Sequence, residues 1–194
     1  MKFPDCSKVH GFSLVDAMLA LAVVALLVTI AIPNLRAQMI KSNLSEQVRD
    51  LYGSLSFAQS EAIKRGGTVT LCKSGDGLAC GGDGVSWNQG WILFADRDGD
   101  GVRDLAGNSP EVLLRTYPAI AANTSLSTGV NHISFDRTGL ANKSGTLVFC
   151  ADGDRHTARA LILGRTKMRI AHDGNRDGIP EKDDGTPIAS CDHP

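Results

Sequence analysis

An apolar segment close to the N-terminus constrains this chain more than any other feature. Within residues 12–33 the only polar residues are Ser13, Asp16 and Thr29. A helix of about twenty residues rises ~30 Å, which matches the hydrocarbon core of a bilayer. The segment therefore predicts a transmembrane helix over residues 12–33. An unpaired carboxylate in such a helix is costly, so Asp16 is expected to have a partner and a function.

The residues before this segment do not look like an ordinary secretory signal. In such a signal the cleavage site follows the apolar core. In this chain the plausible cleavage site follows Gly11, ahead of the core, and residues 1–11 form a short leader that carries Lys2 and Lys8. Cleavage after Gly11 would leave the apolar helix on the mature protein, beginning at Phe12.

Helical periodicity continues beyond Pro33. Apolar residues recur at intervals of three to five positions, the spacing of one helix face: Leu35, Met39, Leu44, Val48, Leu51, Leu55, Ala58 and Ala62. The pattern stops at Gly66 and Gly67, which is typical of a helix end. One long helix over 12–64 is predicted, with residues 34–66 as its amphipathic half.

The remaining residues, 67–194, are predicted to form a β-rich globular domain with a polar C-terminal tail from residue 172. Short β-like runs alternate with turn signals. The expected strands are 68–72, 91–94, 112–117, 133–136, 146–150, 158–163 and 167–171. The predicted class is α+β, with the long N-terminal helix packed on an antiparallel sheet.

The cysteines indicate an oxidising compartment. Cys6 lies in the leader, and the other four are Cys72, Cys80, Cys150 and Cys191. An even number beyond a membrane helix favours disulfides in the periplasm. Three pairings exist; Cys72–Cys80 with Cys150–Cys191 is favoured, because the first closes a short Gly-rich loop and the second tethers the tail. Zinc is the alternative, but no spacing of the C-x2-C kind supports it.

Charge is segregated along the chain. The formal net charge of -1 argues against a nucleic-acid binder that uses its whole surface, although a local patch remains compatible with it. Residues 150–171 contain five Lys and Arg against two Asp, whereas residues 172–194 contain six acidic residues against two basic ones. A basic region is therefore followed by an acidic tail.

The basic region contains a regular cluster. Arg165, Lys167 and Arg169 are spaced by two positions, so in a strand all three would point to one face. Arg155 and Arg159 lie just upstream. These five residues are candidates for DNA contact through phosphates, which would be independent of sequence and sensitive to salt. The alternatives are a solvated strand face and a subunit interface.

Two acidic loops resemble the first half of a calcium loop. In the second, Asp173, Asn175 and Asp177 are spaced as ligands and Asp184 stands at the twelfth position. In the first, over residues 96–101, the twelfth position is a glycine, which offers no side-chain ligand. Asp, Asn and Gly are equally the residues of plain turns, so calcium and turn formation stay as alternatives. No other cofactor is expected.

Catalytic residues are not expected. None of the five histidines lies near a nucleophile in a known arrangement, and no Gly-rich phosphate loop precedes a helix. The sequence thus predicts a protein that is not an enzyme.

The leader junction resembles a known processing signal. Type IV pilins and type II secretion pseudopilins share a class III signal of Gly, Phe, Thr or Ser, Leu, an aliphatic residue and Glu. Residues 11–15 match this pattern in order, and Asp16 replaces the usual Glu. Pro33 falls where these proteins carry a helix-kinking proline.

The globular part is similar to the GspH/FimT group, which includes pseudopilin H of type II secretion and the minor type IV fimbrial pilins T and U. The resemblance covers nearly the whole chain. Its segments are 90–96, 111–115, 133–139, 146–150 and 158–165.

This resemblance implies a processed assembly subunit. Prepilin peptidase would cleave between Gly11 and Phe12, and Phe12 would be N-methylated. Asp16 would meet the N-terminal amine of a neighbouring subunit, since two opposite charges in an apolar filament core are tolerable together. The implied partners are other pilins or pseudopilins and the inner membrane, with the β-rich domain in the periplasm.

Two functions of different kinds follow, besides that of a generic membrane-anchored periplasmic domain. The leading one is a minor pilin or pseudopilin for assembly, priming or the filament tip. The alternative is capture of double-stranded DNA, because pilin T relatives linked to DNA uptake carry a Gly-Arg-x-Arg motif. Gly164 and Arg165 match this motif, and Lys167 replaces its second Arg. Lysine keeps the charge but loses the bidentate fork.

Overall fold

The computed structural model of the protein describes residues 13–106, 110–177, 179–182, 185–188 and 191. The chain divides into two compact units, Met1–Met39 and Ile40–Pro194. The boundary between these units falls within the long N-terminal helix, so each unit contains one part of that helix.

A single helix, α1, runs over Leu14–Arg65, as the periodicity predicted, and continues through Pro33. It ends in a Schellman motif, in which the amide of Gly66 donates to Ile63 O and the amide of Gly67 donates to Ala62 O. Gly66 has a φ of +64°, which explains why the helix ends at a glycine. Over the described residues, no helix combines the length and the apolar character needed to cross a membrane.

The described residues of the second unit contain eight strands and one short 3-10 helix. In chain order they are β1 Thr68–Lys73, η1 Trp87–Gln89, β2 Trp91–Asp96, β3 Leu113–Tyr117, β4 Thr124–Ser127, β5 His132–Phe135, β6 Gly145–Ala151, β7 Asp154–Leu163 and β8 Met168–Ile170.

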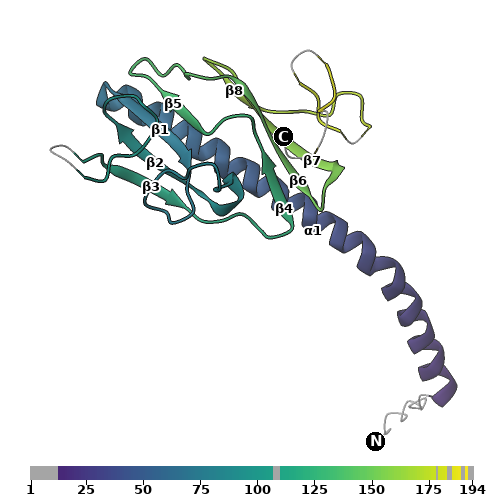
Figure 1. Ribbon diagram of the computed structural model, residues 1–194. Helices are drawn as coiled ribbons and strands as arrows, with labels where there is room; N and C mark the ends of the chain where they lie inside the picture. Colours follow the sequence, from purple (N-terminus) through teal and green to yellow (C-terminus); the bar gives the residue numbers. More distant parts are fainter. Residues whose placement is uncertain (1–12, 107–109, 178, 183–184, 189–190, 192–194) are drawn as a thin grey trace, which may run out of the picture. The chain divides into compact units, whose positions relative to one another are not determined.

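The strands form two antiparallel sheets of four strands each (Figure 1). The first has the order β3-β2-β1-β5 and the second the order β4-β6-β7-β8. In the second sheet, β6 and β7 form a hairpin whose turn contains Asp152 and Gly153, both with positive φ. Positive φ at both central residues is the signature of the tight turns that suit the twist of a hairpin.

One core lies between the second half of α1 and both sheets. From α1 it contains a stripe of fully buried side chains: Leu44, Val48, Leu51, Leu55, Ala58 and Ala62. Val69, Leu71 and Leu93 reach it from the first sheet, and Leu147 and Phe149 from the second. The amphipathic half of the helix is therefore the common support of the two sheets.

Each sheet also has a smaller apolar layer, and each of these layers contains a disulfide. In the first sheet Cys72 is buried with Ile92 and Phe94, and Cys80 packs against them. In the second sheet Cys150 is buried with Ile188 of the C-terminal tail, and Cys191 packs there. The structure has the favoured pairing, Cys72–Cys80 and Cys150–Cys191. The disulfides thus hold a loop on one sheet and the tail on the other.

The structure differs from the expected strands mainly at β4, β7 and β8. The sequence did not predict β4, in which only Leu126 is apolar and reaches the core. β7 begins at Asp154, four residues before the expected start, and β8 is one residue shorter at each end than the expected 167–171. The strands form two sheets, where a single sheet was predicted.

Candidate functional site

The start of α1 is organised by two of its own side chains. The hydroxyl of Ser13 accepts a hydrogen bond from the amide of Val15 at 3.3 Å, and the carboxylate of Asp16 accepts one from the amide of Ser13 at 3.2 Å. This reciprocal pattern is similar to a capping box, with Asp16 at the third helical position, although the Ser13 hydroxyl accepts from the second helical amide instead of the third. Asp16 therefore has a local structural role at the helix start. The predicted processing residues Gly11 and Phe12 lie outside the described residues.

The first unit exposes a long series of apolar side chains. Leu14 is 76% exposed, Leu21 69% and Leu26 64%. Others of this series include Val15, Met18, Leu19, Val23, Val24, Leu27 and Val28. Monomeric soluble proteins rarely expose contiguous apolar patches of this kind, so an apolar phase or partner is expected to cover them. The side chain of Pro33 lies outside the described part.

The predicted DNA-binding residues do not form one site. Arg159 lies on β7, whereas Arg165 and Lys167 belong to the connection between β7 and β8. Arg169 is exposed on β8, and the side chain of Arg155 is outside the described part. The structure therefore separates Arg159 from Arg165 and Lys167 along the strand.

The cations at 165, 167 and 169 were expected to share one face only if the segment is a strand, and this condition is not met, because β8 begins at Met168. Residues 164–167 form a tight turn, in which the amide of Gly164 donates to Lys167 O at 2.8 Å. Alternation of side chains applies only within a strand. Arg165 and Lys167 are exposed at this turn, while Met168 packs against the core.

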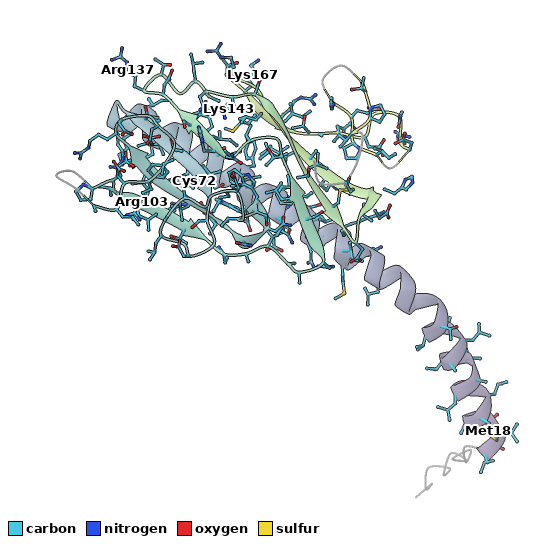
Figure 2. The ribbon with its side chains drawn as sticks, viewed as in Figure 1. Met18, Cys72, Arg103, Arg137, Lys143 and Lys167 are labelled. Carbon is cyan, nitrogen blue, oxygen red and sulfur yellow. A yellow bond between two sulfur atoms is a disulfide. The ribbon has the colours of Figure 1, made fainter. Side chains whose placement is uncertain are left out.

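Three cations that the sequence pattern did not indicate lie near this turn. The loop after β5 carries Arg137 and Lys143, and the amide of its Ala141 donates to Arg165 O at 2.9 Å. Figure 2 shows Arg137, Lys143 and Lys167 along the same edge of the domain.

The third cation is Lys182, which lines a cavity of about 290 Å³ together with Gly164. We call Arg137, Lys143, Arg165, Lys167 and Lys182 the basic edge. Within the described part, none of these five side chains has a carboxylate within 4.0 Å in an ion pair, since both ion pairs there involve Glu61.

In the first acidic loop, which begins at Asp96, carboxylates accept hydrogen bonds from the amides of the loop itself. Asp96 is buried and accepts hydrogen bonds from Thr70 Oγ1 and from the amides of Gly99 and Gly101. Glu111 is also buried and accepts from the amides of Arg97 and Asp104.

In the described part, Asp96, Asp98 and Glu111 are the group whose carboxylate oxygens lie within 4.8 Å of one another. The spacing of the loop residues did not indicate Glu111, which comes from the segment before β3. Because backbone donors already engage the two buried carboxylates, the loop accounts for their burial without a cation.

The second acidic loop is an exposed turn. The amide group of Asn175 donates to the carboxylate of Asp177 at 3.1 Å, and the amide of Asp177 donates back to Asn175 Oδ1. Asp177 also accepts from the amide of Ile179. These are the contacts of an Asx turn, which is the alternative that the sequence left open. Asp173 lies in the described part, and Asp184 lies outside it.

Comparison with solved structures identifies the class of protein from its fold. The fold is that of a pilin-like protein: it is similar to the type IV minor pilin FimU of Pseudomonas aeruginosa, with a TM-score of 0.52 and 18% identity over 68% of this chain and 90% of that one. It is also similar to the minor pseudopilin EpsH of the type II secretion system of Vibrio cholerae, with 10% identity over 68% of this chain and 98% of that one, and a TM-score of 0.45.

The family follows from the sequence itself. The family described as Type II transport protein GspH matches residues 47–166, which is more than half of the chain. The chain belongs to this family and is a GspH/FimT-type minor pilin or pseudopilin. No curated protein gives a significant match.

Proposed function

We propose that this chain is a membrane-anchored subunit that takes part in the assembly or priming of a type IV pilus or a type II secretion pseudopilus. The observation that carries the proposal is the contrast between the two halves of α1. The half that belongs to the second unit buries its apolar stripe against both sheets, whereas residues 14–28 leave their apolar side chains exposed. Exposed apolar surface of this extent is stabilised by a bilayer or by the helices of neighbouring subunits.

Maturation at the leader is the first testable part of this proposal. Replacing Gly11 with valine should block removal of residues 1–11, so mass spectrometry of the purified protein should find the uncleaved chain. Gly53→Val is a matched control, because a side chain at this helical glycine meets no atom within 4 Å. Normal shortening of the Gly11→Val protein would exclude cleavage at this junction.

Asp16 allows a sharper test, because its charge can be separated from its capping role. Asparagine keeps an oxygen that can accept from the Ser13 amide but removes the charge, whereas glutamate keeps both. If Asp16 pairs with the amine of a neighbouring subunit, Asp16→Asn should be inserted in the membrane but lost from sheared filaments, and Asp16→Glu should be retained. Equal incorporation of both variants would leave capping as the role of Asp16.

The basic edge favours a second candidate function, which is contact with double-stranded DNA. Several exposed cations from three separate segments gather there, and such a surface binds phosphates through counterion release. The described residues give no aromatic contact to these cations that would indicate base stacking, so binding should depend on salt rather than on sequence.

The test is fluorescence anisotropy with labelled duplex DNA over a series of salt concentrations. Each phosphate contact contributes about 0.9 to the slope of log K against log salt. Arg165→Gln with Lys167→Gln should therefore reduce the slope by up to about 2. Arg49→Gln is the control, because Arg49 is an exposed cation on α1. Binding that is absent at low salt, or unchanged in the double variant, would exclude this surface.

A further inference from the structure

A separate cavity of about 300 Å³ lies at the other basic region of the second unit. Its lining comes from α1, β7 and the segment that follows β8. The polar residues that line it are Lys41, His156, Arg159, His172 and Asp173, and the apolar ones are Ala171 and Pro180. We call it the basic cavity.

Strand pairing places two of these side chains together. Leu161 pairs with Ile170, and the ladder continues with the amide of Ala171 donating to Ala160 O at 2.8 Å. The same antiparallel register sets Arg159 opposite His172, so their side chains lie on one face of the sheet. Lys41 reaches this cavity from the helix.

The guanidinium of Arg159 is oriented by a backbone carbonyl. Its Nη1 donates to Ala158 O at 2.9 Å, and Arg159 is half-buried. Neither of the ion pairs in the described part includes Arg159 or Lys41. An oriented guanidinium still has donors for an oxyanion in a fixed fork, and partial burial strengthens such contacts.

The chemistry of the lining selects an anion. The side chains of Lys41 and Arg159 carry two positive charges, against the single carboxylate of Asp173. The imidazoles of His156 and His172 can each donate one more hydrogen bond. Buried Ala171 and Pro180 form an apolar wall, which reduces competition from water.

From this arrangement we propose that the basic cavity binds a phosphate group, as a monoester or diester. The group can come from a soluble phosphate or from the headgroup of an anionic phospholipid. The lipid source rests on the membrane anchoring proposed above, since Lys41 follows residues 12–33 closely in the sequence. The soluble source does not depend on that proposal.

The experiment uses the full chain in detergent and in nanodiscs. Isothermal titration with inorganic phosphate, at matched ionic strength in chloride, measures the soluble source. Native mass spectrometry of nanodiscs with phosphatidylglycerol against phosphatidylcholine measures retention of the lipid. Whichever phosphate probe binds the wild type, its affinity should fall at least tenfold in Arg159→Gln. The same loss is expected separately in Lys41→Gln. Lys41→Gln serves as the second variant because Lys41 is exposed and its loss should not affect folding.

One control separates this cavity from other cations. Arg49→Gln removes an exposed cation of the same helix. It should bind phosphate like the wild type. Tryptophan fluorescence should be unchanged in every variant, because Trp87 and Trp91 are buried in the second unit.

The outcomes are distinct. Saturable phosphate binding that both cavity variants weaken supports the proposal, and preference for phosphatidylglycerol assigns the source to lipid. If the protein binds inorganic phosphate but retains no phosphatidylglycerol, the ligand is a soluble phosphate. This result would count against a membrane close to the cavity, and it would not count against phosphate binding in the cavity. The proposal is overturned if neither probe binds saturably, if the cavity variants bind like the wild type, or if duplex DNA alone binds.

Discussion

The disulfide that holds the tail should stabilise the domain more than the one that holds the Gly-rich loop. Cys150 and Cys191 are separated by 41 positions, and Cys72 and Cys80 by 8. A cross-link restricts the unfolded chain more when it closes a longer loop. The chain-entropy relation gives about 4 kcal/mol for the long loop and about 2.5 kcal/mol for the short one.

The two double variants can be compared directly, because each replaces two cysteines with alanine and so removes the same atoms. Cys72 and Cys150 are each 1% exposed, so their alanine variants lose similar packing. Cys150→Ala with Cys191→Ala should therefore reduce the free energy of unfolding by about 1.5 kcal/mol more than Cys72→Ala with Cys80→Ala.

The assay is urea unfolding of the full chain in detergent, without reductant. Fluorescence of Trp87 and Trp91 reports on the second unit, since both are buried there. An equal loss in the two double variants, or a larger loss for the short loop, would refute the reasoning. Packing of Cys72 and Cys80 on the first sheet would then outweigh loop length.

Three other predictions concern the core, the acidic loop and pH. Leu55→Ala should lower the free energy of unfolding by about 2–5 kcal/mol, because Leu55 is fully buried, and urea unfolding should show less than about 0.5 kcal/mol for the exposed Glu46→Ala. EDTA should leave the melting temperature unchanged, since backbone donors satisfy the first acidic loop; a calcium-dependent rise that Asp98→Asn abolishes would contradict this. Burial, followed by the charge of Lys143, lowers the pKa of His132, so its imidazole stays neutral to a lower pH in the folded state than in the unfolded chain. The stability it contributes is present above about pH 6.5 and is lost as the pH falls toward the lowered folded pKa, because the unfolded chain binds the proton first. Unfolding at pH 7.5 and 5.5 should differ less in His132→Gln than in the wild type, and an equal difference would exclude this histidine as the cause.

The sequence predicted the elements whose signal is local. The apolar spacing up to Ala62 and the Gly66–Gly67 pair define α1, because helix periodicity and a C-terminal glycine act within a few residues. It did not predict β4, since Thr124–Ser127 offers one apolar side chain and is held mainly by pairing with β6. Such pairing depends on residues far along the chain.

The candidate sites were harder to predict for the same reason. The expected face of Arg165, Lys167 and Arg169 assumed a continuous strand, but the turn from Gly164 to Lys167 interrupts it. Arg137 lies near that turn only because the loop after β5 contacts it, through the hydrogen bond from the Ala141 amide to Arg165 O. Spacing within one segment cannot reveal such a contact.

The length of β7 determines how strongly the charges of Arg159, on this strand, and of Arg165, in the turn that follows it, affect each other. Arg159 and Arg165 are six positions apart, and the four strand residues between them, 160–163, alone rise about 13 Å, whereas the screening length at physiological salt is about 8 Å. The charge of Arg165 is therefore largely screened from Arg159. A substitution that strengthens or abolishes anion contact at Arg165 should leave anion contact at Arg159 nearly unchanged, so these two parts of one small domain can evolve separately.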